Sequence, residues 1–144
     1  MFNFFKRKKH GWSVYHGELG GVLTTARLNY DFSNPGKYNF HVGIAFPLGA
    51  LGYQSFPPEQ DNEELNLLED KFCEYFEAHG GICVATILNR TFKEIDFFLP
   101  DITGIKEDYE SGLLNFSEKF PFQMMIESDT KGEFFKTIQR MLGI

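Results

Sequence analysis

The sequence has few cysteines and no long apolar run. Of its 144 residues only two are cysteine, Cys73 and Cys83. They form no Cys-x-x-Cys motif and have no histidine at zinc-finger spacing, which argues against a metal or redox site. We expect two buried free thiols in preference to a disulfide. No apolar run approaches the roughly 20 residues of a membrane span, and the first ten residues lack the apolar centre of a secretory signal.

Motifs for phosphate binding and nucleophilic catalysis are also missing. The glycine pairs at 20–21 and 80–81 match neither a dinucleotide fingerprint nor a P-loop, so we interpret them as turn and helix-cap glycines. No serine lies in a Gly-x-Ser-x-Gly elbow, and neither cysteine has a nearby cation that would activate it. The sequence therefore predicts no cofactor, no metal ion and no catalytic residue.

Two weak candidates for chemistry remain. His16 and His41 fall on predicted strands that would be neighbours, and with Glu18 they would form a weak metal or acid–base site. Two surface or half-buried histidines are the favoured alternative. Glu94 and Asp96 lie two apart on a predicted strand and so point the same way. They would make a shared acidic site, but an outward, solvated strand face is the favoured interpretation.

Positive charge is scarce outside the first ten residues. The net charge of −6 comes from 14 basic and 20 acidic residues, and residues 6–9 supply four of the basic ones without any acid. The remaining body thus holds 10 basic and 20 acidic residues. Such a body suits a basic partner and is a poor nucleic-acid binder, because phosphate binding needs clustered Lys and Arg. We interpret residues 1–10 as an arm packed on the domain, with contact to an anionic membrane as the alternative.

Aromatic residues are abundant, and their share excludes a disordered chain. Phe, Tyr and Trp make up 17% of the sequence, which disordered segments do not reach. The length predicts a single domain over residues 1–144. Alternation and helical periodicity predict six strands and three helices. Strands are expected at 12–18, 22–30, 38–46, 82–88, 91–99 and 120–127, and helices at 61–79, 101–114 and after a cap at Ser128 or Asp129.

The order of these elements indicates an α+β fold. From the third strand onward it is βαββαβ, the ferredoxin-like order. We therefore expect a ferredoxin-like antiparallel sheet with an added N-terminal β-hairpin and a C-terminal helix. The helices should pack mainly on one face of the sheet.

The predicted helix at 61–79 carries the most informative surface. Asp61 and Glu64 have the spacing of an N-terminal capping box, and the apolar residues recur at helical spacing. On a helical wheel four acids fall opposite the apolar stripe, and Leu67 lies at their edge. An exposed apolar residue within a field of one charge is typical of a protein-binding patch, although acidic faces also serve solubility. The proposed partner-binding residues are Glu63, Leu67, Asp70, Glu74 and Glu77.

Several short motifs give the chain a family resemblance. They are Trp12 at the start of the first strand, Arg27-x-Asn29, the Gly52 loop with Pro57, Leu67-Leu68-Glu69-Asp70, the hairpin around Arg90, and Phe120-x-Phe122 followed by Ile126-Glu127-x-Asp129. With these motifs the chain resembles the bacterial family catalogued as domain of unknown function 695. The resemblance implies a ferredoxin-like α+β fold and carries over no catalytic residue. The chain departs from the family pattern at Thr130-Lys131-Gly132, where a proline and an aromatic residue are usual.

In size and charge the chain is similar to small cytoplasmic immunity proteins of bacterial toxin systems. The leading hypothesis is a non-enzymatic inhibitor that neutralises a basic, nuclease-type toxin through its acidic helix, because a nuclease needs a basic surface for its substrate. One alternative is a housekeeping regulator of a cellular ribonuclease, which rests on fold analogy. The other is a small hydrolase or metal-dependent enzyme that uses His16, His41 and Glu18.

Overall fold

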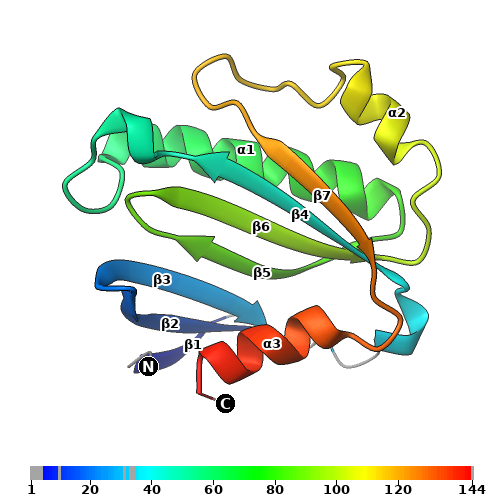
Figure 1. Cartoon of the computed structure of the whole chain (residues 1–144), viewed down its shortest axis with the longest axis horizontal. Helices are drawn as coiled ribbons and strands as arrows, with labels where there is room; N and C mark the ends of the chain where they lie inside the picture. The colour runs from blue at the N-terminus through cyan, green and yellow to red at the C-terminus, as the bar shows by residue number, and fades with distance from the viewer. Residues whose placement is uncertain (1–4, 10, 31, 33–34, 144) are drawn as a thin grey trace.

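The computed structural model describes residues 5–9, 11–30, 32 and 35–143. In this part of the chain seven strands form one sheet, with every neighbouring pair antiparallel and the order β1-β2-β3-β5-β6-β4-β7 (Figure 1). The strands are β1 (Phe5–Lys9), β2 (Trp12–Leu19), β3 (Val22–Asn29), β4 (Phe40–Pro47), β5 (Ile82–Leu88), β6 (Phe92–Leu99) and β7 (Gln123–Ser128). The helices are α1 (Glu59–Ala78), α2 (Ile105–Glu110) and α3 (Glu133–Met141). The predicted α+β class is confirmed.

The sheet is wider than the sequence predicted. β1 lies in the segment that we interpreted as an N-terminal arm, and it pairs with β2 from Phe5 opposite His16 to Lys9 opposite Trp12. The sequence of β1 is dominated by basic residues and lacks apolar alternation, which is why periodicity missed it. The predicted packing of the arm's first phenylalanines, Phe2 and Phe4, lies outside the described residues. With β1, β2 and β3 all beyond β5, the order of the whole sheet is not the four-strand ferredoxin-like one.

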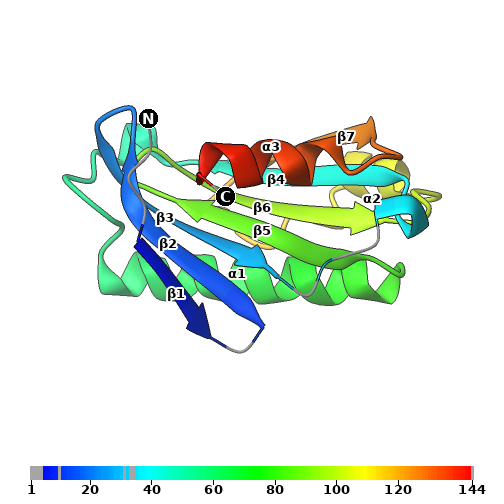
Figure 2. The same ribbon diagram turned by 90° about the horizontal axis from the view of Figure 1, so that it is seen from below.

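Helices cover both faces of the sheet, where we expected them mainly on one (Figure 2). α1 and α2 pack on one face, against the side chains of β4 and β6 that alternate toward them. α3 packs on the other face, where it completes a second apolar cluster. The first core includes Val42, Ile44, Phe46, Leu65, Phe72, Ile95, Phe97 and Ile105. The second includes Tyr15, Leu28, Phe32, Val84, Ile87, Phe98, Phe135 and Ile138.

Helix boundaries differ from the prediction at two places. α1 begins at Glu59 after Pro58, so Asp61 lies inside the first turn and does not cap the helix. Its carboxylate instead accepts a hydrogen bond from Tyr53 and pairs with Lys119. α2 covers only part of the predicted range 101–114. Gly104 and Gly112 bracket it with φ of 84° each, a left-handed conformation that ends an α-helix.

Other predictions hold in the described residues. Cys73 and Cys83 are free thiols, the first half-buried and the second buried. β5 is an interior strand whose residues from Cys83 to Ile87 are all buried. No helix in the described part of the chain is long and apolar enough to cross a membrane.

Candidate functional site

The acidic side chains predicted on α1 all face solvent. Glu63, Asp70, Glu74 and Glu77 are exposed, and Leu67 has 61% of its surface accessible. The buried side of the helix consists of Leu65, Leu68, Phe72 and Phe76. In Figure 2 the sheet lies on one side of α1 and the other side is open. The five residues therefore form one exposed acidic face; whether it binds a partner stays a prediction.

Glu69 interrupts this pattern, because it turns toward the sheet. Both of its carboxylate oxygens accept hydrogen bonds from Arg27 at 2.7 Å, and Lys93 lies 2.9 Å away. Burial raises the pKa of Glu69, but the two cations outweigh it and hold that pKa below its usual value. Of the consecutive acids Glu69 and Asp70, only Asp70 is exposed.

Three of the motifs behind the family resemblance meet at this ion pair: Trp12, Arg27-x-Asn29 and Leu67-Leu68-Glu69-Asp70. Arg27 also donates to Thr86 at 2.8 Å, and its guanidinium lies 5.6 Å from the centre of the Trp12 ring. Asn29 donates to the backbone carbonyl of Cys83 at 3.2 Å. These residues join β2, β3 and β5 to α1. In this structure they hold the fold together and present no reactive group.

The structure separates the two histidines that the sequence analysis grouped into one candidate site. β3, β5 and β6 lie between β2, which carries His16 and Glu18, and β4, which carries His41. Strand spacing of about 4.8 Å puts β2 and β4 roughly 19 Å apart, too far for one metal or acid–base site. His16 is exposed and pairs with Thr25 across the hairpin. The prediction of a site formed by His16, His41 and Glu18 is therefore wrong, because β2 and β4, which we expected to be neighbours, are not adjacent in the sheet.

His41 instead lies at the centre of a buried chain of carboxyl groups. Its Nε2 is 2.8 Å from Oδ1 of Asp96 on β6, and its Nδ1 is 2.9 Å from Oε1 of Glu127 on β7. The His41 and Asp96 side chains are almost fully buried, whereas the Glu127 side chain is about half exposed. The imidazole stacks on Phe134 of α3, with ring centres 3.7 Å apart. Phe134 of α3 thus covers the middle of the chain, at His41.

Glu94 extends this chain at the other end. It lies two residues before Asp96, on the same face of β6, and is half-buried. Oδ2 of Asp96 is buried and receives no hydrogen bond from an N–H or hydroxyl group of the described residues. A protonated Glu94 supplies that bond. The favoured interpretation of these acids as a solvated strand face is wrong, because α3 and the second core cover Asp96.

Burial determines how protons are distributed along the chain. It raises the pKa of Asp96 to about 7 and that of Glu94 to about 8, the latter also through repulsion by Asp96. Burial likewise lowers the pKa of His41, against the opposite effect of Glu127. Below pH 7 the consistent arrangement has Glu94 donating to Asp96, Asp96 to Nε2 of His41, and Nδ1–H of His41 to the Glu127 carboxylate. In this arrangement the Glu94, Asp96 and His41 side chains are neutral.

A pocket of about 240 Å³ adjoins the Glu94 end of the chain. Its lining comes from β4, β6 and β7: Gly43, Ala45, Glu94, Gln123, Met124 and Met125. Gly43 lies opposite Asp96 on one side and Met125 on the other, and Ala45 lies opposite Glu94 and Gln123. A Cβ at Gly43 would lie 3.2 Å from Oδ1 of Asp96 and 3.6 Å from Cε of Met125. The small residues of β4 therefore leave a depression between the acids of β6 and the side chains of β7.

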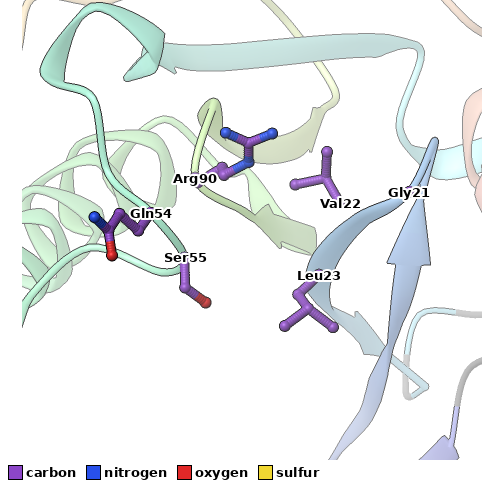
Figure 3. Close-up of a pocket in the computed structure, with 6 residues that line it drawn as sticks. All are labelled: Gly21, Val22, Leu23, Gln54, Ser55 and Arg90. Atoms are coloured by element: carbon purple, nitrogen blue, oxygen red, sulfur yellow. The ribbon is translucent and has the colours of Figure 1, made fainter.

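A larger pocket, of about 380 Å³, lies at the end of the sheet where three loops meet (Figure 3). The β2–β3 hairpin contributes Gly21, Val22 and Leu23, the loop before α1 contributes Gln54 and Ser55, and the β5–β6 turn contributes Arg90. Arg90 is the only charged residue in this lining. The pocket has hydrogen-bonding groups but no acid–base pair, so the buried chain is the better candidate for chemistry.

Sequence reasoning missed this chain because its members come from three strands. The signal available was two acids two apart on a strand rich in apolar residues, which is a strand expected to be covered on both faces. The third member, His41, was visible only as a lone histidine on another strand. Among the described residues no group of three or more His, Cys, Asp or Glu side chains is arranged to hold a metal ion.

Comparison with known proteins places the chain in a family without assigning an activity. No curated protein and no solved structure matches it. The model of a family of unknown function, DUF695, matches residues 10–138, which is most of the chain. This range contains α1 with its acidic face and every member of the buried chain. The chain belongs to the DUF695 family.

Proposed function

We propose that the protein is a non-enzymatic binding module whose acidic α1 face docks on a basic protein. The observation that carries the proposal is the common exposure of Glu63, Asp70, Glu74 and Glu77 around Leu67, 61% exposed. Like charges at spacings of three and four residues mildly destabilise a helix. These acids therefore do not serve the stability of the helix, and their position on the open side of α1 favours a role in binding.

The most concrete partner is a basic, nuclease-type bacterial toxin, which makes the protein a cytoplasmic immunity protein. A nuclease carries a basic surface for its substrate, and an acidic inhibitor reaches that surface by electrostatically steered association. Leu67 would supply an apolar anchor within the charged contact. The remaining alternative is a regulator of a cellular ribonuclease, which would act on the same kind of surface without a toxin.

The test uses the basic protein encoded beside this gene. Cells that produce this basic protein should grow again when the DUF695 protein is co-expressed. The two proteins should bind each other with an affinity that falls steeply as the salt concentration is raised. Reversing charge with Asp70→Lys and Glu74→Lys should weaken binding by at least about tenfold, mainly through slower association. Surface plasmon resonance at several salt concentrations measures the association and dissociation rates.

The control changes the net charge equally at exposed acids on β2 and α3, away from α1, with Glu18→Lys and Glu133→Lys. We expect these variants to keep most of the affinity. Equal losses in both pairs would reduce the effect to net charge and contradict a role for the α1 face. An altered RNA turnover after deletion of the gene, with no toxin encoded nearby, would favour the ribonuclease regulator.

We also propose that the segment from β4 to β7 is a ferredoxin-like unit to which β1, β2 and β3 have been added. Its support is the βαββαβ order of β4, α1, β5, β6, α2 and β7. These four strands lie in the order β5-β6-β4-β7, and α1 and α2 contribute to one core. A crystal structure in which β7 pairs with a strand other than β4 would contradict this assignment.

A further inference from the structure

The pocket beside Glu94 lies on the sheet face opposite α1, so it is separate from the proposed docking surface. Glu94 and Asp96 alternate along β6 with Ile95 and Phe97, which pack in the core beneath α1. The acids therefore face the side on which α3 packs. Figure 2 shows the sheet between α1 and α3, so the sheet separates a partner bound to the outer side of α1 from the face that carries Glu94.

No Lys or Arg of the described residues pairs with either of the two acids. Glu94, Asp96, Glu127 and Asp129 all influence His41, and no Lys or Arg among the described residues forms an ion pair or hydrogen bond with any of the four. Lys93, adjacent in sequence, is on the other face of β6 and pairs with Glu69. His41 contributes a neutral ring where burial holds its pKa down. Four acids thus share one region with no fixed positive charge.

Burying a carboxyl group without a compensating positive charge costs free energy of folding, and replacing one of these acids would remove that cost. Glu94 lies in the wall of the pocket, and the neighbouring Asp96 has a buried oxygen, Oδ2, that receives no hydrogen bond from an N–H or hydroxyl group of the described residues. Gly43 and Ala45 leave the floor free, and the thioether of Met125 offers an apolar wall. The site has the features of a receptor for a group that is positively charged, donates several hydrogen bonds and carries a short apolar chain.

We propose that this pocket binds the ammonium or guanidinium end of a small organic cation, with Glu94 as its counter-ion. On binding, the proton of the Glu94 carboxyl leaves to solvent, and the resulting carboxylate accepts hydrogen bonds from the cation. Gln123 lines the same pocket, and Asp96 lies beside Gly43 of its lining. Metal ions are disfavoured as occupants because the described residues offer no set of three ligands.

Isothermal titration calorimetry of the full chain at pH 7 tests the proposal, with butylammonium, butylguanidinium and butanol as probes. The two cations should bind and butanol, which matches butylammonium in length but is neutral, should not. Titrations in phosphate and in Tris should differ in heat, because binding releases the Glu94 proton. Loss of the carboxylate in Glu94→Gln should weaken binding at least about tenfold, as expected for a lost charge-assisted hydrogen bond.

Two further variants keep the result interpretable. Ala45→Leu fills the pocket without changing its charge and should abolish binding, whereas Glu133→Gln on the exposed side of α3 should leave it unchanged. Circular dichroism of each variant verifies that it is folded. Equal binding to wild type and Glu94→Gln, equal affinity for butanol, or no heat up to millimolar cation would overturn the proposal.

An N-acetyl-lysine methylamide probe distinguishes the source of the cation. Tighter binding of this probe than of butylammonium assigns the pocket to a lysine side chain of another protein. Tighter binding of the free amine assigns it to a small metabolite. Either result supports the cation site, since the recognising chemistry is the same.

Discussion

Glu69 and Asp70 are consecutive acids on α1, and their surroundings differ. Glu69 bridges Arg27 and Lys93, and the Lys93 side chain is 3% exposed. Glu69→Ala leaves the buried Lys93 ammonium group without its counter-ion, with Asn66 as its remaining hydrogen-bond acceptor, which costs about 3–5 kcal/mol of the free energy of unfolding. Asp70→Ala removes a solvated charge and should change it by less than about 0.5 kcal/mol. Urea denaturation of both variants measures the difference.

The same comparison identifies what the ion pair contributes. If Glu69→Ala and Asp70→Ala proved equally stable, the pair with Arg27 and Lys93 would have no net role. Glu69→Gln is informative as well, because an amide oxygen still accepts hydrogen bonds while the charge is gone. We expect its stability to fall between those of wild type and Glu69→Ala.

At the scale of elements, α3 depends on one carboxylate outside it. Oδ1 of Asp129 accepts the backbone N–H of Glu133 at 2.7 Å, and Oδ2 accepts that of Phe134 at 2.9 Å. The prediction that Ser128 or Asp129 caps this helix is met by Asp129, although Gly132 occupies the N-cap position. Two otherwise unpaired helical N–H groups are satisfied in this way.

Asp129→Ala should therefore loosen α3 selectively. The loss of two charge-assisted hydrogen bonds costs about 1–3 kcal/mol, and Phe134 would no longer be held against His41. Hydrogen exchange should accelerate for amides of α3 and remain slow for β5. Ser128→Ala, at an exposed neighbour, is the matched control. Uniform acceleration across both elements would contradict a local role for Asp129.

At the scale of the whole molecule, the buried chain predicts how stability depends on pH. The pKa values of Asp96 and Glu94 are about 7 and 8 in the folded protein, above their ordinary values near 4. The native state therefore holds protons that the unfolded state has lost, and this stabilisation, complete below the ordinary pKa values, disappears as pH rises through 7 and 8. The lowered pKa of His41 has the opposite effect on stability, and this effect is confined to pH values around and below the ordinary histidine pKa of 6.5.

We expect the free energy of unfolding to fall by about 1–3 kcal/mol between pH 6.5 and 8.5. Glu94→Gln should flatten most of this dependence, because a glutamine amide donates to Asp96 at every pH. Denaturation curves at several pH values give the pH dependence of the free energy of unfolding for the wild type and for Glu94→Gln. A wild-type stability that is constant or rises over this range would be inconsistent with protonated Glu94 and Asp96.

The sequence by itself determined the local structure. Apolar alternation placed β2 to β7, helical periodicity placed α1 and its exposed acidic face, and glycines marked the turns. These features depend on neighbours within a few residues, which the sequence displays directly. The range of α2 was overestimated because glycine at positive φ ended it on both sides, and β1 was missed because an edge strand of basic residues lacks apolar periodicity.

Tertiary structure alone decided which strands are neighbours, and with them the candidate site. His16 and His41 became distant because β3, β5 and β6 come between their strands, whereas His41, Asp96 and Glu127 met through the registers of β4 with β6 and β7. α3 folds back on the second face of the sheet. Asp96 is buried there and Glu94 is half-buried, although we expected both acids to be solvated. A strand's residues fix which side each side chain takes, but only the packed sheet fixes what lies beside it, and burial then sets its charge.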